Sequence, residues 1–433
     1  GGAPIPLTPE VDGAALRFAD FELDGPRNRI LAVMEDHRSG AKEPVNSLAA
    51  IDLGGGCEEP VVMAAGADFY AAPSLSAAGD RLAFICWDHP CMPWDVTSLM
   101  AVRLGSEDGL PMGAPSLVAG GSQKQESPQQ PQWTPDGRLV YISDEVSGWW
   151  NLFAATFADA NASSSSSSSS SLEVAETKSL CPMECCEFGG PPWSLGMSSY
   201  KVLSNESLLC SFSDVDKPTR TLAVLNLSDG TLDEISIPYG SFGSVEVQVD
   251  AATGKPARLA LVGGSTLKPS EIAVCDDAEK SPQGWTVLKV SSPNALDEAY
   301  LSEPQVIKYP TSNGKRHAYM YYYPPKNPDF EGATAEERPP LLVKTHGGPT
   351  AATSANYNLG IQYWTSRGFA VADVNYGGST GYGREYRELL KGAWGIVDVE
   401  DAAGAATYLA EKGLVDPKRL AIDGGSAGGY TTL

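Results

Sequence analysis

The 433-residue chain is predicted to combine two fold classes: all-β repeats over residues 1–300 and an α/β domain over residues 301–433. In the first region, short apolar runs are bounded by Gly, Pro, Asp, Asn and Ser with almost no helical periodicity, which is typical of strands and turns. Beyond the segment 293–303, strand-like apolar runs alternate with helical patterns. This alternation is typical of a parallel sheet with crossover helices.

One pattern recurs in the amino-terminal region. Residues 73–84 match residues 131–141 through turns at Gly79 and Gly137, and weaker copies lie at 24–33 and 203–212. Each copy consists of a strand, a turn and a hydrophobic strand, as in a propeller blade. We expect about five blades with long loops, because blade repeats run at about 40–50 residues. The region is therefore predicted to be an incomplete β-propeller.

A run of nine serines, Ser163–Ser171, interrupts the repeats. Such a tract cannot bury apolar surface, so it is predicted to be a disordered loop. A tolerated expansion between two strands explains it more simply than a phosphorylated segment does.

The α/β region is expected to start with a strand at 315–319, followed by a surface loop over 324–340. Four further elements are expected: a buried strand over 341–345, a helix over 361–367, a buried strand over 369–374 and a helix over 398–412. On the last helix, one apolar face is predicted to hold Val399, Ala402, Ala406 and Leu409.

The most informative motif lies at the end of the sequence. Leu420–Ile422 is predicted to be a strand, and it leads into Gly424-Gly-Ser426-Ala-Gly428, the Gly-x-Ser-x-Gly elbow of α/β-hydrolases. In this tight turn Gly424 and Gly428 must lack side chains, and Ser426 projects its hydroxyl above the sheet. Ser426 is therefore the candidate nucleophile, and the region is predicted to be the first half of an α/β-hydrolase domain.

A second motif follows the strand 341–345. His346-Gly347-Gly348-Pro349 has the pattern of an oxyanion loop, in which the Gly347 and Gly348 backbone stabilises developing negative charge together with the N–H of Ala427. An ordinary Gly/Pro turn is the simpler alternative, but two such motifs in the right order, each ending a strand, favour the catalytic interpretation. His346 is expected to support the loop rather than to abstract protons.

These motifs resemble the peptidase domain of the prolyl oligopeptidase family, and most closely its acylaminoacyl-peptidase-like branch of plant and algal type. The resemblance rests on the segments 345–349, 375–383, 394–395 and 424–429 together with Asp398. It implies a serine peptidase that hydrolyses short peptides through an acyl-enzyme on Ser426, without metal or organic cofactor. It also implies a complete propeller of seven blades that filters substrates, and the cytosol or a plastid as compartment.

Two departures from the family pattern matter. The family's catalytic Asp and His, which follow the nucleophile, have no counterpart here, so the chain looks truncated at both ends and is expected to be inactive alone. Many members carry Arg at the position of Gly377, which leaves the anchoring of the substrate open.

Composition limits the partners. The formal net charge of −23 argues against nucleic acid and anionic membrane surfaces. No apolar run approaches the roughly 20 residues that cross a bilayer. The cysteine cluster 181–186 lacks a second pair or a histidine at metal-ligand spacing, so no metal site is expected. The oligomeric state stays open.

Two alternative functions remain. An esterase or amidase uses the same acyl-transfer machinery on the same scaffold. A short, non-catalytic form acting as a propeller-based binding module belongs to a different class. The pairs Glu58-Glu59 and Glu336-Glu337 are interpreted as solvated surface charge rather than as a site for a substrate's amino terminus, which favours an acylaminoacyl or oligopeptidase preference.

Overall fold

The computed structural model describes residues 4–158, 171–250, 252–293, 296–311, 314–332, 334 and 337–433. They form two compact units: one lies within residues up to 232, and the other combines 233–433 with the short segments 184–187 and 210–224. Except for Ser171, the nine-serine run lies outside the described residues.

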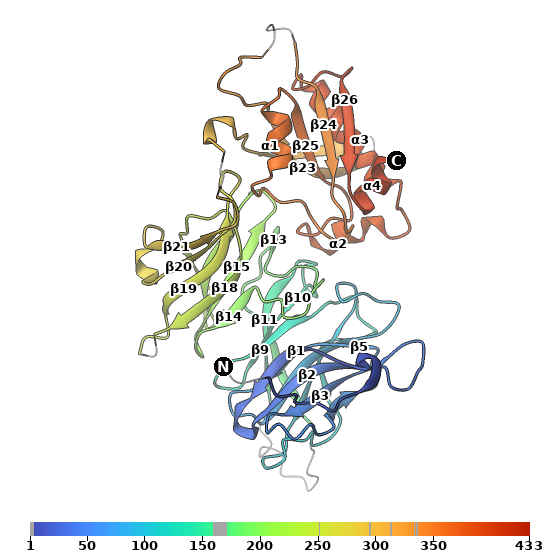
Figure 1. The fold of residues 1–433 in the computed structure, drawn as a ribbon, viewed down its shortest axis with the longest axis vertical. Helices are drawn as coiled ribbons and strands as arrows, with labels where there is room; N and C mark the ends of the chain where they lie inside the picture. Colours follow the sequence, from blue (N-terminus) through green and yellow to red (C-terminus); the bar gives the residue numbers. More distant parts are fainter. Residues whose placement is uncertain are drawn as a thin grey trace. The chain divides into compact units, whose positions relative to one another are not determined.

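Five antiparallel sheets build the repeat region (Figure 1). The first two contain β1 Leu16–Asp24, β2 Arg29–Asp36, β3 Val45–Asp52 and β4 Val61–Ala65, and then β5 Phe69–Leu75, β6 Arg81–Trp87, β7 Ser98–Arg103 and β8 Ser116–Gly120. The third contains β9 Gln129–Trp133, β10 Leu139–Ser143, β11 Asn151–Phe157 and β12 Val174–Ser179. The fourth contains β13 Cys186–Glu187, β14 Tyr200–Val202, β15 Ser207–Asp214, β16 Arg220–Asn226 and β17 Leu232–Ile235. The fifth contains β18 Ser241–Val249, β19 Pro256–Gly264, β20 Glu271–Cys275 and β21 Trp285–Val290.

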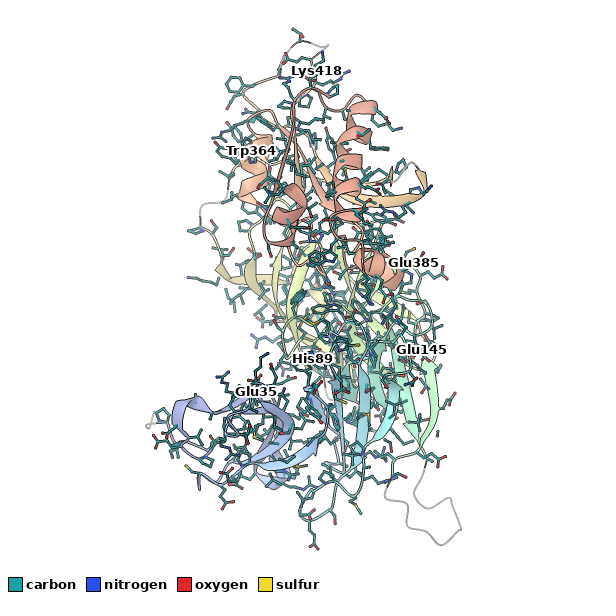
Figure 2. All side chains as sticks on the ribbon, turned by 90° about the vertical axis from the view of Figure 1, so that its right-hand side faces the viewer. Glu35, His89, Glu145, Trp364, Glu385 and Lys418 are labelled. Carbon is teal, nitrogen blue, oxygen red and sulfur yellow. The ribbon has the colours of Figure 1, made fainter. Side chains whose placement is uncertain are left out.

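These sheets confirm the predicted propeller-type repeats. Glu35, His89 and Glu145 are carried by this region, as the labelled side chains of Figure 2 show. The repeated turns at Gly79 and Gly137 join β5 to β6 and β9 to β10, and both glycines have left-handed backbones with φ of 67° and 85°.

Each repeat also carries a backbone irregularity that the sequence pattern does not reveal. A non-glycine residue with positive φ interrupts the first strand of the first, second, third and fifth sheets and immediately precedes that of the fourth sheet. These residues are Asp20 in β1 (56°), Ala72 in β5 (51°), Gln130 in β9 (55°), Ser244 in β18 (48°) and Cys185 before β13 (62°). Bulges of this kind bend a strand and redirect its side chains. Because the same irregularity recurs at the first strand of each sheet, it marks the blades as equivalent units even where their sequences differ.

Arginine side chains connect the first three sheets to their successors. In each case a guanidinium near the turn of one sheet donates to a backbone carbonyl at the turn of the next sheet. The pairs are Arg27 with Gly79 at 3.0 Å, Arg81 with Gly137 at 3.0 Å, and Arg138 with Asn205. The aligned turns of the sequence repeat are thus the points where neighbouring blades contact.

The carboxy-terminal part is a five-stranded sheet in the order β22-β23-β25-β24-β26. Its strands are β22 Gln305–Thr311, β23 Arg316–Tyr323, β24 Leu341–Thr345, β25 Ala370–Asn375 and β26 Leu420–Gly424. Only β25, β24 and β26 are parallel, while β22 and β23 join the sheet in antiparallel pairing. The run at 315–319 therefore forms the second strand rather than the first, because residues 305–311 pair with it as a hairpin.

Helices α1 Leu359–Thr365, α2 Gly383–Arg387, α3 Val397–Glu411 and α4 Ala427–Thr432 accompany this sheet. Helix α3 packs against it through Ala402, Ala405, Ala406 and Leu409. The prediction for Val399 was wrong, since 41% of its surface is exposed. Two carboxylates on the buried side, Asp398 and Asp401, bind loops instead.

Figure 2 labels Trp364 and Lys418 in this part. None of the helices described here is both long enough and apolar enough to pass through a bilayer.

Candidate active site

Ser426 lies in a sharp turn between β26 and α4. Its backbone has φ 55° and ψ −122°, a conformation that L residues adopt at a cost of about 1–3 kcal/mol. The residue is exposed. Near the end of α4, Thr431 donates from Oγ1 to Asp398 of α3 at 2.6 Å. This bond ties the short helix behind the serine to the longer one.

The flanking glycines have no room for a side chain. A Cβ on Gly428 would lie 2.1 Å from the Thr345 carbonyl oxygen, and one on Gly424 would lie 2.4 Å from the Gly428 carbonyl oxygen. The Thr345 hydroxyl fills the remaining space and donates to the Gly428 carbonyl at 2.9 Å. This packing brings the end of β24 directly against the turn that carries Ser426.

The His346–Pro349 segment therefore adjoins the serine. A Cβ on Gly347 would lie 3.1 Å from the Ser426 Cβ and 3.7 Å from its Oγ. Among the described residues, no hydrogen bond occupies the backbone N–H groups of Gly347, Gly348 or Ala427. The predicted oxyanion donors thus lie next to the candidate nucleophile and are free to bind a developing negative charge.

His346 is held in place by the loop that follows β25. Its ring stacks on Tyr376 at a centroid distance of 4.4 Å, and the Tyr376 hydroxyl donates to the His346 carbonyl at 2.7 Å. Nδ1 lies 2.8 Å from the Gly347 carbonyl and Nε2 lies 2.8 Å from Ser379 Oγ. Burial lowers the pKa of His346, although the bond to Gly347 opposes that shift.

The carbonyl partner fixes the direction of one of these bonds. A carbonyl can only accept, so Nδ1 carries a hydrogen and donates to Gly347. Nε2 has Ser379 Oγ as its partner, and the Ser379 hydroxyl donates to the Tyr376 carbonyl at 2.7 Å. Both ring nitrogens of His346 are then occupied. The side chain supports the glycine loop and has no free nitrogen to act on Ser426.

Gly377 is enclosed in the same loop. A Cβ there would lie 2.6 Å from Val397 Cγ1 and 3.0 Å from Leu389 Cδ1. Its backbone N–H donates to Asp401 Oδ2 at 2.7 Å. The space beside this backbone, where many family members carry an arginine, is filled by aliphatic side chains of this chain.

Within the part of the chain that the structure describes, no general base contacts Ser426. Among the described residues, the Ser426 hydroxyl has no hydrogen-bond partner, and His37 and His89 pack beside Glu35 and Phe69 of the repeat region. His317 lies in β23. No group of His, Cys, Asp and Glu able to hold a metal ion occurs within the described ranges.

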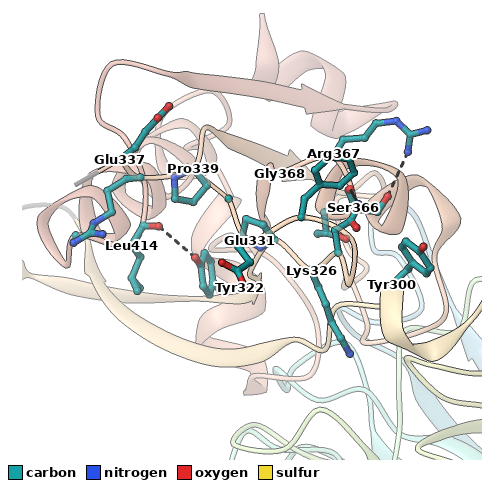
Figure 3. A pocket seen from close by; sticks show the side chains of 17 residues that line it. Tyr300, Tyr322, Lys326, Glu331, Glu337, Pro339, Ser366, Arg367, Gly368 and Leu414 are labelled. Atoms are coloured by element: carbon teal, nitrogen blue, oxygen red, sulfur yellow. Dashed lines mark hydrogen bonds between the residues drawn. The ribbon is translucent and has the colours of Figure 1, made fainter. Parts of the chain in front are cut away.

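A separate hollow of about 1240 Å³ lies in the same part of the chain (Figure 3). Its walls include Pro339, Gly368 and Leu414, which precede β24, β25 and β26. The hollow is therefore at the amino edge of the parallel strands. Ser426 follows the carboxyl end of β26, so this hollow is not the site around the serine.

Several supporting residues went unnoticed in the sequence. Ser379 and Tyr376 lie inside the 375–383 motif, but nothing in the pattern links them to His346. Thr431 lies one turn after the elbow without a recognisable signal. Glu187, whose carboxylate binds the same loop from β13, is 194 residues away from its nearest partner.

Comparison with known proteins agrees with this architecture. Residues 355–433 match the Prolyl oligopeptidase family. Acylamino-acid-releasing enzyme 1 of Oryza sativa subsp. japonica is 29% identical over 163 residues, which are 37% of this chain and 21% of that protein. A puromycin-hydrolyzing peptidase of Mycobacterium tuberculosis superposes with a TM-score of 0.82 at 35% identity, covering 99% of this chain and 61% of that one. A puromycin hydrolase variant solved in complex with PGG gives a TM-score of 0.82 at 34% identity, covering 100% and 61%.

Fold and site together define a β-propeller joined to an α/β-hydrolase-type domain with a serine elbow. The chain is similar to members of the prolyl oligopeptidase family, including acylamino-acid-releasing enzymes. It spans about three fifths of the solved relatives and a smaller share of the rice enzyme.

Proposed function

We propose that this chain carries the nucleophile and oxyanion hole of a serine peptidase that hydrolyses short peptides. The observation that carries the proposal is the strained Ser426 elbow packed against Gly347, with unoccupied N–H groups on both sides. The names of the relatives support a hydrolase acting on peptides or on acylated amino acids, and one of them was solved with the peptide PGG.

In the proposed reaction, Ser426 Oγ attacks the scissile carbonyl while a general base removes its proton. The N–H groups of Gly347, Gly348 and Ala427 stabilise the tetrahedral oxyanion, and the leaving amine takes up the proton. The resulting acyl-enzyme is then hydrolysed by water. Because both ring nitrogens of His346 are occupied, we propose that the base is not supplied by residues 1–433. A serine without its base loses about a millionfold in kcat.

We also propose a division of labour along the chain, with substrate selection by the propeller region 1–300 and chemistry by the region 301–433. In this scheme the enclosed backbone at Gly377 cannot anchor a substrate through a side chain. Recognition of the peptide must then use other groups on the loops around Ser426.

The test compares two proteins on N-acyl peptide anilides and simple esters: residues 1–433, and the product of the complete native transcript. We expect negligible turnover by residues 1–433. If the transcript continues with an Asp and a His at strand ends, its product is expected to cleave the anilides and to lose activity on S426A substitution. A longer product with no better turnover contradicts the proposal.

The same assay addresses the alternatives. Ester cleavage without anilide cleavage indicates an esterase on this scaffold. A native stop codon after Leu433, together with a soluble and protease-resistant product, leaves the propeller-based binding module as the better explanation.

A further inference from the structure

A glutamate of the repeat region binds a loop of the α/β part. Glu187 lies in β13 and only 1% of its surface is exposed. Its Oε2 accepts from the Gly381 N–H and its Oε1 from the Gly383 N–H, both at 3.1 Å. All three residues belong to the same compact unit. Both carboxylate oxygens are thus committed to backbone groups of a single loop.

The loop that Glu187 binds also contacts the segment beside the nucleophile. Ser379 Oγ is bonded to His346 Nε2 at 2.8 Å, and the Thr380 N–H donates to the Ala351 carbonyl at 2.9 Å. Residues 379–383 therefore hydrogen-bond to Glu187 through one set of groups and to the segment 346–351 through another.

A carboxylate suits this position for a chemical reason. Gly381 and Gly383 have φ of 90° and 79°, conformations that glycine adopts without strain, and both present an N–H to the same side chain. Only a side chain with two accepting oxygens satisfies both donors, since an amide offers one oxygen and one NH₂ group. Bonds to an ionised acceptor are also stronger than neutral ones.

We propose that Glu187 is a positioning residue for the oxyanion hole. By fixing Gly381 and Gly383 it fixes Ser379, and Ser379 in turn orients His346, whose Nδ1 holds the Gly347 carbonyl. The importance of this series of contacts for catalysis rests on the proposed function. The coupling from Glu187 to the glycine loop is a property of the fold. A residue outside the α/β sequence motifs thereby sets the geometry of the catalytic backbone.

The coupling is tested by hydrogen–deuterium exchange and NMR on residues 1–433 carrying E187Q, with E184Q as the matched control. Glu184 is an exposed glutamate on the same segment. In E187Q an NH₂ group faces one of the two N–H donors, so amide exchange is expected to rise about tenfold at 379–383. In the described part of the chain the Gly347 and Gly348 amides carry no hydrogen bond, so the decisive result for the segment 346–351 is a shift of the NMR signals of the His346 ring. E184Q is expected to leave both segments unchanged. If E187Q does not fold, the same measurement is made on E187D, which keeps two oxygens on a shorter side chain.

Two results overturn the proposal. Faster exchange at 379–383 with unchanged His346 ring signals shows that Glu187 holds only the loop 379–383. A uniform rise across 233–433 shows a general structural role.

The catalytic consequence is measured in whichever of the two proteins compared under the proposed function cleaves the anilides. There E187Q is expected to lower kcat about tenfold with little change in KM, because the loss concerns the transition state. An unchanged kcat overturns the positioning role. Intact coupling in the exchange and NMR experiments without any hydrolase activity refutes the proposed function instead.

Discussion

The closest contacts around Ser426 are made by backbone atoms. A single Cβ added to one of the neighbouring glycines can therefore prevent the turn from forming. Gly428 faces the Thr345 and His346 carbonyl oxygens at 2.1 and 2.7 Å from the position of a Cβ, whereas nothing lies within 4 Å of a Cβ on Gly425. Both glycines occur in the same five-residue motif. The sequence marks them as similar, but only the packing distinguishes their roles.

Gly428→Ala is therefore expected to destabilise the α/β part by at least about 2 kcal/mol, because backbone atoms of β24 cannot move aside without breaking the sheet. Gly425→Ala, the matched control, should stay within about 0.5 kcal/mol. Urea unfolding followed by tryptophan fluorescence measures both. Equal midpoints for the two variants would show that β24 yields more easily than its hydrogen bonds suggest.

A buried carboxylate on β25 gives a pH-dependent prediction. Asp373 is almost fully buried, and this burial raises its pKa to about 6, although the Thr353 hydroxyl and the Lys344 charge oppose the shift. Above pH 6 the carboxylate is ionised in the folded and unfolded states, and burial of its charge costs stability. Below about pH 4 it is protonated in both states and the cost disappears.

Asp373→Asn is expected to stabilise the protein by up to about 3 kcal/mol above pH 6, with the gain shrinking as the pH falls from 6 to 4. Its matched control is Asp423→Asn on β26, which lies in the same row of the sheet on the other side of Lys344. Bonding to Lys344 lowers the pKa of the half-exposed Asp423, so the control should lose a little stability above pH 4. Unfolding midpoints from pH 4 to 8 give the comparison, and a pH-independent effect of Asp373→Asn would contradict the assignment.

At the level of the elements, the repeats are related by turn-to-turn arginine bonds rather than by sequence identity. Arg81 illustrates the pattern. Besides its bond to the Gly137 carbonyl, its guanidinium lies 5.9 Å from the Trp133 ring and 5.7 Å from the Phe157 ring. One side chain of the second sheet thus contacts both a turn and two aromatic residues of the third.

Arg81→Met keeps the aliphatic stem and removes the donor, so a loss of about 1–2 kcal/mol is expected. Arg17→Met is the control, since Arg17 is exposed and its nearest carboxylate oxygen, on Glu35, is 3.8 Å away. That control should cost less than about 0.5 kcal/mol. Thermal unfolding measures the loss of stability in both variants. Similar unfolding midpoints would mean that the aromatic packing alone joins the sheets.

At the level of the whole molecule, the α/β sheet has an open edge. Among the described strands, β26 pairs only with β24, and it exposes Leu420 and Ile422 by 45% and 41%. An exposed apolar edge strand is a template for pairing with another chain. The net charge of −23 opposes such association at low ionic strength, since the copies repel each other.

Residues 1–433 are therefore expected to self-associate as salt is raised, and Ile422→Lys should suppress this. Val399→Lys is the control because Val399 is equally exposed, at 41%, but lies on helix α3 away from the strand edge. Analytical ultracentrifugation at low and high salt provides the measurement. Equal association of both variants would indicate that the edge is not the contact.

Sequence alone determined the features that depend on local backbone chemistry: the turn glycines of the repeats, the alternation of strands and helices, the Ser426 elbow and the glycine loop after His346. Each is a short segment whose residue types leave few conformations. The family resemblance rested on the last two of these features, together with the segments 375–383 and 394–395 and Asp398.

Only the tertiary structure decided the rest, because it depends on contacts between distant segments. The pairing of β22 with β23 made the sheet mixed rather than parallel. The exposure of Val399 and the burial of Asp401 followed from what α3 packs against, which its periodicity does not specify. The bonds of Glu187 to Gly381 and Gly383 join segments almost 200 residues apart, and no local pattern encodes a partner at such a distance.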